Sequence, residues 1–362
     1  MVLQSVVKAA KTARGALCKG VAIAAFRGTL KGTQTQVTLD YAGPGDLSRE
    51  VEWFFNSPPR KVALLASPDL AFIAAPIPVP GDDVDLFYPY LDATLPVAST
   101  VDAQIARVRS KPHRRRLRSV QRSPHWVYQV VRTQEAFDHF LDTLHLPFVN
   151  ERFVERARLP DRAMLRRRFK KSGLVVQVLC DGVVVSGALL FHEGSKLDYD
   201  RNGFGAGLSK SATQLAEKTA AVELAIFHVA QELGVSDIAM GFCRAFLRCG
   251  LYTHKRRLGC TFQPATGLPP FRLKLPRALR PAFLSAVPML VGKPAASTAR
   301  VGLVENSGRR EKPDWKSLVR NLTVPSVRHI EVWTNASAAR VELFVGYLDT
   351  FAPGRTVSVY SV

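Results

Sequence analysis

The sequence predicts an α+β fold in which a mixed sheet is flanked by helices. Segments that alternate apolar and polar residues, as in 126–132 and 174–203, are typical of strands. Residues 212–233 instead carry apolar side chains at three- and four-residue steps, which is typical of an amphipathic helix. Strand-like and helix-like segments are interspersed along the chain, so both kinds of element are expected to share one core.

The composition indicates a globular protein that attracts anions. The chain has 362 residues, enough for two domains or three small ones, and 47% of them are hydrophobic. Fifty Lys and Arg against 30 Asp and Glu give a formal net charge of +20. Such a surface favours phosphates, nucleic acid, acidic glycans or anionic lipid. A GC-rich genome is a second explanation for part of the arginine excess.

The chain divides into five segments by composition and pattern. These are a basic N-terminal segment (1–35), an α+β half (36–100), a second α+β domain (101–265), a Pro- and Arg-rich linker (266–326) and a β-rich tail (327–362). The first half contains strand-like segments at 36–43, 61–67 and 70–80. The tail is expected to contain about three strands.

The domain at 101–265 has the most regular pattern. It is expected to begin with a helical tract broken or started at Pro112, followed by a strand, a helix from Thr133 and a basic helix. An antiparallel meander then turns at Asp181-Gly182, a pair suited to a tight hairpin. The long helix is expected to end at Gly234, before an apolar strand and a short helical turn.

The cysteines and the apolar runs limit the class of protein. Five cysteines form no CxxC pair and have no histidine at zinc spacing, so no metal site is expected. An odd count without a secretory signal fits the cytoplasm. No apolar run is long enough to span a bilayer, although the basic N-terminus leaves peripheral contact with the inner membrane as a hypothesis.

A glycine-rich segment between a strand and the long helix is the first candidate site. Backbone N–H groups without Cβ crowding, at the start of a helix, form a cradle for anions. We expect this segment to bind phosphates, although a plain turn is the alternative. Its candidate residues are Arg201, Asn202, Gly203, Gly205, Gly207, Ser209 and Lys210.

Three groups of basic residues are further candidates for anion contact. Lys255, Arg256 and Arg257 follow the short helical turn and are expected to neutralise phosphates of a nucleotide-bearing ligand or of a tRNA end. Two arginine-rich tracts, at 107–122 and 152–171, suggest contact with nucleic acid, the alternative being a solvated basic face. The residues proposed for that contact are Arg114, Arg115, Arg116, Arg118, Arg166, Arg167 and Arg168.

Acid–base chemistry at this site requires a carboxylate or an imidazole. An amine must be neutral to attack an acyl group, so a base within hydrogen-bond reach is expected. The candidates are Asp200, Asp237 and His254. Capping or ion pairing is an equal alternative for Asp237. No base is placed beside a cysteine, so covalent catalysis is not favoured.

Residues 101–262 resemble the FemAB-like branch of the GNAT acyltransferase superfamily. The resemblance rests on the basic tract SKPHRRRLR, the meander DGVVVSGALLFHEGSKLDYDRNGF, the strand ending DIAMG and the close HKRRLG. Within it, Asp237, Gly241, Lys255, Arg256 and Gly259 match the last motif. The segment between Gly241 and Lys255 is longer than in the family, and Leu208-Ser209-Lys210 stands where a proline is common.

The resemblance implies a FemAB-type mixed sheet, preceded by a related but degenerate half. It also implies an N-acyltransferase with no tightly bound cofactor, whose co-substrate is acyl-CoA or an aminoacyl-tRNA. The acceptor is then an amine, or a hydroxyl, on a sugar, peptide or lipid precursor, as in envelope or polysaccharide synthesis. The oligomeric state and the role of residues 266–362 do not follow from it.

Two other functions are compatible with the same residues. One is a non-catalytic protein that binds RNA or another polyanion through the arginine tracts. The other is a membrane-surface enzyme anchored by the basic N-terminus and the segment LPRALRPAFLSAVPML.

Overall fold

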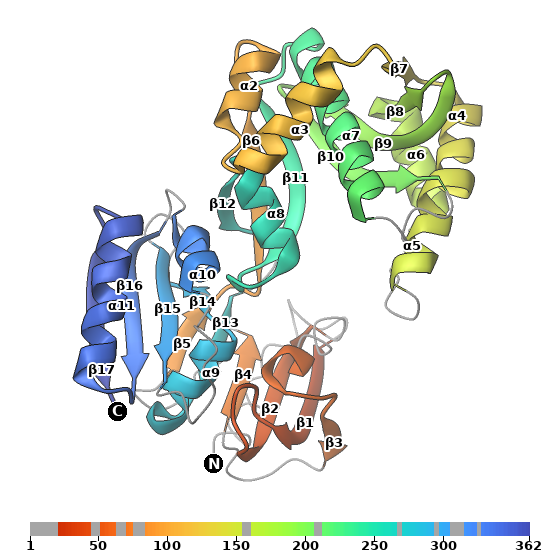
Figure 1. The fold of residues 1–362 in the computed structure, drawn as a ribbon. Coiled ribbons are helices and arrows are strands. Elements are labelled where there is room, and N and C mark those ends of the chain that lie inside the picture. Colours follow the sequence, from red (N-terminus) through yellow and green to blue (C-terminus); the bar gives the residue numbers. More distant parts are fainter. Residues whose placement is uncertain are drawn as a thin grey trace. The chain divides into compact units, whose positions relative to one another are not determined.

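The computed structural model describes residues 21–44, 51–62, 70–74, 84–153, 161–205, 212–265, 270–292, 297–304, 315–323 and 327–362. The chain forms two compact units, each with its own sheet (Figure 1). Unit 1 comprises Met1–Leu91, Cys243–Thr253 and Gln263–Val362, and unit 2 comprises Asp92–Phe242 and His254–Phe262. Most of the domain predicted at 101–265 lies in unit 2, while the half at 36–100 and the tail at 327–362 contribute strands to the sheet of unit 1.

Unit 1 contains a ten-stranded sheet in the order β17-β16-β15-β14-β5-β13-β4-β2-β1-β3. Its pairs are mostly antiparallel, but β2 runs parallel to β4, and β15, β16 and β17 run parallel to one another. The strands are β1 (Val21–Thr29), β2 (Gln36–Pro44), β3 (Arg60–Val62), β4 (Leu70–Ala74), β5 (Val84–Phe87), β13 (Phe271–Lys274), β14 (Met289–Val291), β15 (Ser297–Leu303), β16 (Val327–Thr334) and β17 (Thr356–Ser361). The helices of this unit are η6 (Arg277–Leu279), α9 (Arg280–Ala286), α10 (Trp315–Leu322) and α11 (Ala338–Phe351).

Two expectations for this part of the sequence differ from the structure. Residues 266–326 were expected to form a linker, but they supply three strands of the sheet and three helical segments. The reason is visible in β13, where Phe271 and Leu273 are buried, while Arg272 between them and Lys274 after them are only partly buried. The tail contains a helix, α11, between its two strands, because Phe344 and Leu348 lie four residues apart and are both 1% exposed.

Unit 2 contains a seven-stranded mixed sheet in the order β12-β6-β11-β10-β9-β8-β7. Its strands are β6 (Tyr90–Pro96), β7 (Trp126–Val131), β8 (Gly173–Cys180), β9 (Val183–Glu193), β10 (Lys196–Phe204), β11 (Asp237–Arg244) and β12 (Thr261–Pro264). Its helices are α2 (Val101–Arg107), α3 (Lys111–Arg122), α4 (Gln134–His139), the π-helix η3 (Phe140–His145), α5 (Leu146–Phe153), α6 (Arg162–Ser172), α7 (Ala212–Glu232) and α8 (Gly250–Leu258), the last beginning in unit 1.

The structure confirms the predicted fold class and most elements of this unit. Helix α3 begins after the cap Ser110, with Pro112 in its first turn, and α4 begins after the cap Thr133. The turn between β8 and β9 has Asp181 at φ 51° and Gly182 at φ 80°, which a tight hairpin requires. The sheet is therefore mixed, with an antiparallel meander (β7 to β10) and a parallel pair (β10 and β11).

The two faces of this sheet are covered by different helices. Segments α4, η3 and α6 contact β8, β9 and β10 and enclose an apolar core containing Phe140, Phe169, Leu189 and Phe191. Helix α7 contacts the same three strands and is itself packed against α2 and α3. Because side chains alternate along a strand, neighbouring residues of β10 point toward these two different helical layers.

Asp40, in β2, gives a test of the core of unit 1. Its side chain is 1% exposed, neither oxygen has a hydrogen-bond partner among the described residues, and burial raises its pKa to about 6. The raised pKa means that this residue costs stability as the pH rises from about 4 to above 6, by up to about 3 kcal/mol. We therefore expect Asp40→Asn to stabilise the protein at pH 7, and the gain to shrink toward pH 4.

Urea unfolding of both proteins between pH 4 and pH 7 measures this difference. Asp349→Asn, at an exposed position of α11, removes the same charge and should change stability little at any pH. A difference for Asp40→Asn that is flat with pH would show that Asp40 keeps an ordinary pKa in the folded protein.

Candidate functional site

A buried carboxylate lies at the centre of unit 2. Glu223 is in the middle of α7, is 2% exposed, and is surrounded in the sequence by Ala, Val, Leu and Ile. An ionised carboxylate without partners would be very costly in such a place. Its partners therefore decide whether the helix can pack against the sheet.

Two histidines from other helices supply those partners. His113 of α3 places Nε2 against Oε2 of Glu223. His254 of α8 places Nε2 3.3 Å from Oε1. The His113 side chain is 16% exposed and that of His254 is 42% exposed. The cluster thus joins three helices and presents one of its two imidazoles to solvent.

The charges of this cluster support an ionised glutamate. Burial alone would raise the pKa of Glu223, but the two facing imidazoles outweigh burial and lower the pKa to about 2. Tyr199 lies in β10, and burial together with the negative charge of Glu223 raises the pKa of its hydroxyl. Glu223 is therefore a carboxylate, and Tyr199 a neutral phenol, at physiological pH.

The cluster lies where two parallel strands stop pairing. Strands β10 and β11 are in register only from Lys196–Asp237 to Asp198–Ala239, although both continue further as described strands. Tyr199, next to Glu223, follows the last paired residue of β10. On β11, Lys255 Nζ donates to the carbonyl oxygens of Gly241 (2.7 Å) and Phe242 (2.8 Å). Gly241 adopts φ 67° within β11, a conformation that glycine tolerates.

Of the three predicted acid–base residues, the structure places His254 in this cluster and the other two elsewhere. Asp200 forms ion pairs with Arg201 (2.9 Å) and Arg168 (3.8 Å), and Arg168 belongs to α6, on the other face of the sheet. Asp237 accepts a hydrogen bond from Ser236 Oγ (2.7 Å). Asp237 pairs with Lys196 of the neighbouring parallel strand, and Asp200 lies four residues beyond Lys196. The two aspartates are therefore about 13 Å apart along the strands.

The predicted phosphate cradle has another role in the residues that the structure describes. Asn202 and Gly203 are within β10, paired with β9, and Gly205 donates its N–H to Val185 (3.0 Å). A Cβ at Gly203 would lie 2.7 Å from the Leu144 carbonyl carbon, so this glycine is needed for close packing of η3. His145 Nδ1 donates to the Asn202 carbonyl (2.7 Å) and, because it is buried, its pKa falls to about 4. Gly207, Ser209 and Lys210 lie outside the described residues.

The three basic residues of α8 do not form one exposed patch. Lys255 is 4% exposed and Arg256 is 5% exposed, whereas Arg257 is exposed. Lys255 binds backbone carbonyl oxygens and so holds β11 in place. Of these three, only the side chain of Arg257 is open to a ligand in this structure.

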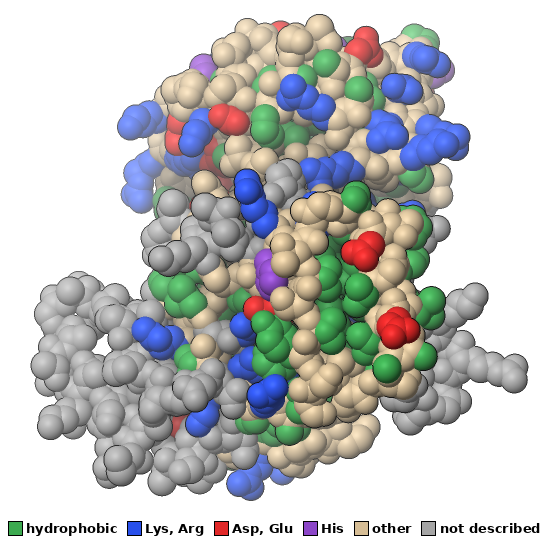
Figure 2. Space-filling model, turned by 90° about the vertical axis from the view of Figure 1, so that its left-hand side faces the viewer, with side chains coloured by type: hydrophobic (Ala, Val, Ile, Leu, Met, Phe, Trp, Pro, Cys, Tyr) green, Lys and Arg blue, Asp and Glu red, His purple; other side chains and the backbone are tan. Residues whose placement is uncertain are grey.

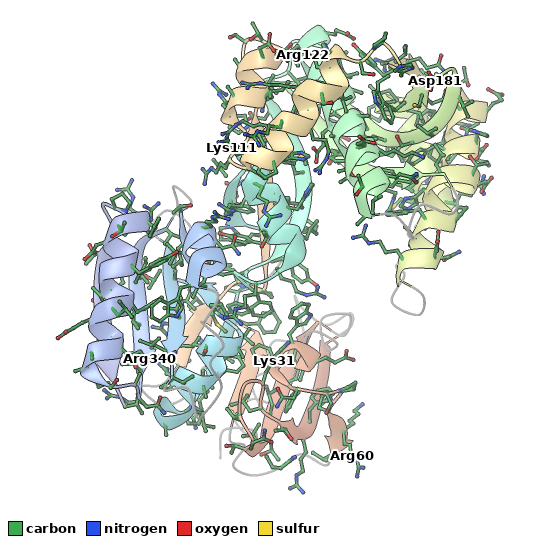
Figure 3. All side chains as sticks on the ribbon, viewed as in Figure 1. Lys31, Arg60, Lys111, Arg122, Asp181 and Arg340 are labelled. Carbon is green, nitrogen blue, oxygen red and sulfur yellow. The ribbon has the colours of Figure 1, made fainter. Side chains whose placement is uncertain are left out.

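The two arginine tracts differ in how far their charge is already paired. In α6, Arg166 pairs with Asp138 (2.7 Å), and Arg168 pairs with Glu193 and Asp198 and lies over the Phe191 ring (3.9 Å). Arg167 is exposed. In α3, which runs from Lys111 to Arg122 in Figure 3, Arg115 and Arg118 are exposed and Arg116 is half-buried. Arg114 Nη1 donates to the Val108 carbonyl. Figure 2 shows Lys and Arg side chains spread over one face of unit 2.

Glu223 and His113 were missed in the sequence reading. Glu223 interrupts an otherwise apolar run in α7, and a lone acidic residue there signals a buried, partnered charge. His113 lies within the arginine-rich tract, where the neighbouring arginines dominate the pattern. Neither residue could be linked to His254 without the packing of three helices.

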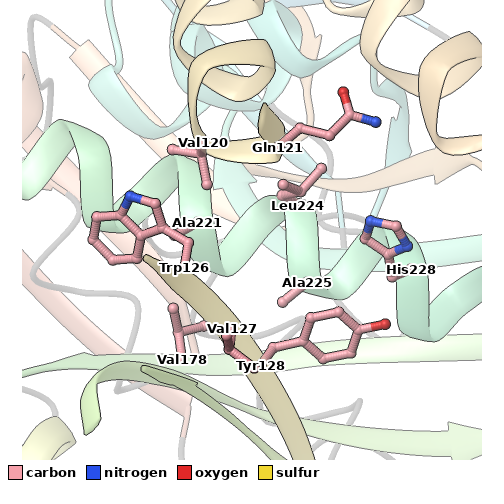
Figure 4. Close-up of a pocket in the computed structure, with 10 residues that line it drawn as sticks. All are labelled: Val120, Gln121, Trp126, Val127, Tyr128, Val178, Ala221, Leu224, Ala225 and His228. Atoms are coloured by element: carbon pink, nitrogen blue, oxygen red, sulfur yellow. The ribbon is translucent and has the colours of Figure 1, made fainter. Parts of the chain in front are cut away.

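An aromatic hollow lies beside the edge strand β7 (Figure 4). Tyr128 stacks on His228, with ring centroids 5.5 Å apart, and its hydroxyl donates to Glu232 (2.6 Å). The hollow measures about 110 Å³, and its lining is mostly apolar. It is lined by Val120, Gln121, Trp126, Val127, Tyr128, Val178, Ala221, Leu224, Ala225 and His228.

Two further observations concern metals and membranes. Among the described residues, no three or more His, Cys, Asp or Glu side chains are arranged to hold a metal ion. Across the same residues, no helix combines the length and apolarity that crossing a bilayer requires.

Known proteins resemble this chain in structure and not in sequence. No family model matches the chain, and no curated protein does. FemX is similar over 70% of this chain and 88% of its own, at 11% identity and a TM-score of 0.39. The C-terminal domain of a putative lysylphosphatidylglycerol synthetase from Agrobacterium fabrum is similar over 75% of this chain and 92% of its own, at 13% identity and a TM-score of 0.35. A GCN5-related N-acetyltransferase from Kribbella flavida is similar over 76% of this chain and 95% of its own, at 13% identity and a TM-score of 0.24.

The histidine–glutamate cluster predicts how the second unit responds to loss of one charge. Glu223→Gln leaves two imidazoles facing a neutral amide, and we expect a loss of about 2 to 4 kcal/mol at pH 7. The lowered pKa of Glu223 means that its contribution is complete above about pH 4.5 and disappears toward pH 2. The stability gap should therefore close as the pH falls through that range, as measured by denaturant unfolding.

Glu217→Gln, at an exposed position of the same helix, is the matched control and should change stability by less than about 0.5 kcal/mol. Equal losses in the two variants would contradict a special role for the buried carboxylate.

Proposed function

We propose that the protein transfers an acyl or aminoacyl group from an activated thioester or ester to an amine or a hydroxyl. The observation that carries this proposal is the pair formed by exposed His254 and buried Glu223, beside the point where β10 and β11 separate. A half-exposed imidazole held by a buried carboxylate is the arrangement that a general base requires.

The proton relay follows from which nitrogen faces the carboxylate. We place the proton of His254 on Nε2, the nitrogen 3.3 Å from Glu223 Oε1, which leaves the lone pair of Nδ1 free. Nδ1 takes a proton from the acceptor amine as its nitrogen attacks the acyl carbon. The new C–N bond forms, the C–S or C–O bond of the donor breaks, and the imidazolium returns the proton to the leaving group. Glu223 stabilises the imidazolium between these steps.

The separation of β10 and β11 supports a place for the donor. Beyond Asp198 and Ala239, the facing backbone groups of the two strands are not paired with each other in the described residues. Such groups suit an extended arm, because a strand edge hydrogen-bonds to an extended ligand. Lys255 keeps two β11 carbonyl groups turned toward α8 and so stabilises the opening. In this proposal, the donor is acyl-CoA or an aminoacyl-tRNA, and the acceptor is an amine of a sugar, peptide or lipid precursor.

Binding of RNA without catalysis remains a second hypothesis, and the pairing within α6 does not favour it. Arg162, Arg166 and Arg168 already have carboxylate partners. Arg115 and Arg118 remain exposed for this role.

His254→Asn is the variant that tests the proposal. Purified protein is incubated with acyl-CoA or charged tRNA and a pool of amines, and release of free CoA or uncharged tRNA is measured. Loss of the base should lower kcat by about 10²- to 10⁴-fold while KM for the donor changes little. His139→Asn, at an exposed position of α4, should retain full activity.

Turnover that survives in His254→Asn would remove this residue from the mechanism. Absence of turnover with every donor, together with salt-sensitive binding to any polyanion, would favour the RNA hypothesis instead.

A further inference from the structure

A second hollow lies outside the histidine–glutamate cluster, beside the edge strand β7 of the seven-stranded sheet. It measures about 330 Å³ and forms where β7 ends, α4 begins and α6 meets β8. Three strands separate β7 from β11 in the sheet. The hollow is lined by Arg132, Gln134, Phe169, Lys170, Lys171, Ser172 and Gly173.

The lining holds three cations and no acidic residue. Arg132, Lys170 and Lys171 are all exposed, and none forms an ion pair with a described carboxylate. Their neighbours on α6 differ, because Arg162, Arg166 and Arg168 each contact Asp or Glu at 2.8 Å or less. Three cations without a carboxylate partner among the described residues therefore gather at the hollow, while Arg167 is exposed elsewhere on α6.

Helix α6 alone does not explain this arrangement. Lys170 and Lys171 are in its last turn, where cations interact favourably with the helix dipole. That accounts for two charges on an exposed helix end. Arg132 comes from a different element, directly after β7, and nevertheless lines the same space.

The nearby acidic residues do not neutralise the hollow. Asp138, which accepts from Gln134 Nε2 (3.3 Å), also holds Arg162 and Arg166 and has its pKa lowered to about 2, mainly by hydrogen bonds from these two arginines. Glu135 is exposed and is not part of the lining. The Ser172 hydroxyl adds a neutral donor to the three cations.

We propose that this hollow binds a phosphoryl group carried by a small ligand. Three cations around one hollow suit a group with two or more negative charges, and an arginine such as Arg132 can donate two parallel hydrogen bonds to phosphate oxygens. A single carboxylate would leave most of this charge without a partner. The site does not depend on the proposed acyl transfer, because none of its residues belongs to the histidine–glutamate cluster.

Titration of the full chain with pyrophosphate tests this site. Calorimetry should give saturable binding at one site per chain, and Lys170→Ala/Lys171→Ala should weaken it by about tenfold or more. The matched control is Arg60→Ala/Lys61→Ala, which removes two exposed cations from β3 and the same net charge. It should change the dissociation constant less than about twofold, and thermal melting should show both variants folded.

The remaining outcomes each decide the proposal. Absence of saturable pyrophosphate binding by the unmodified protein would overturn it, as would equal weakening by both double variants. An RNA oligonucleotide serves as the competitor. RNA binding that pyrophosphate does not displace, and that both double variants weaken alike, would also count against the site, since it would indicate diffuse attraction to a basic surface.

Discussion

The packing of the second unit depends on burying one carboxylate. Glu223 lies in a buried, otherwise apolar run of α7, and its charge is retained because imidazoles from α3 and α8 face it. Removing one of these helices would leave a single imidazole facing the charge, and removing both would leave the charge without either partner in a medium of low polarity. The position of α7 on the sheet, and with it the geometry around His254, is therefore tied to three helices that are distant in the sequence.

Alternation along β10 separates two sets of charges that the sequence places side by side. Asp198 and Asp200 interact with Arg168 of α6, whereas Tyr199, between them, lies near Glu223 of α7. One face of the strand thus carries a surface ion-pair network, and the other carries the buried cluster. A change of register by one residue would move the ion-pair residues to the face of the buried cluster and Tyr199 to the other face. The irregular pairing of β10 near Asp200 therefore helps to position the site.

Local patterns predicted most elements of unit 2, while long-range contacts were beyond them. The caps Ser110 and Thr133, the Asp181-Gly182 turn and the apolar stripe of α7 act within a few residues and can be read from the sequence. His254 was predicted as a candidate for its chemistry, but its link to Glu223 depends on how α7 and α8 pack. Gly203 looked like part of an anion cradle, because a sequence shows a small residue without showing which neighbour requires it to be small. In the segment 266–326, prolines and arginines obscured the alternation of Phe271 and Leu273.

The side chain of Lys255 has a consequence for chemical reactivity. Its ammonium group is buried and donates to two carbonyl oxygens of β11, which hinders both the loss of a proton and the approach of an electrophile. Exposed lysines such as Lys170 and Lys171 have no such protection. Amine-directed labelling reagents, and any activated acyl compound in the medium, should thus modify the periphery of the protein first and spare the lysine adjacent to His254. Modification at Lys255 would then report local opening of β11 rather than ordinary surface exposure.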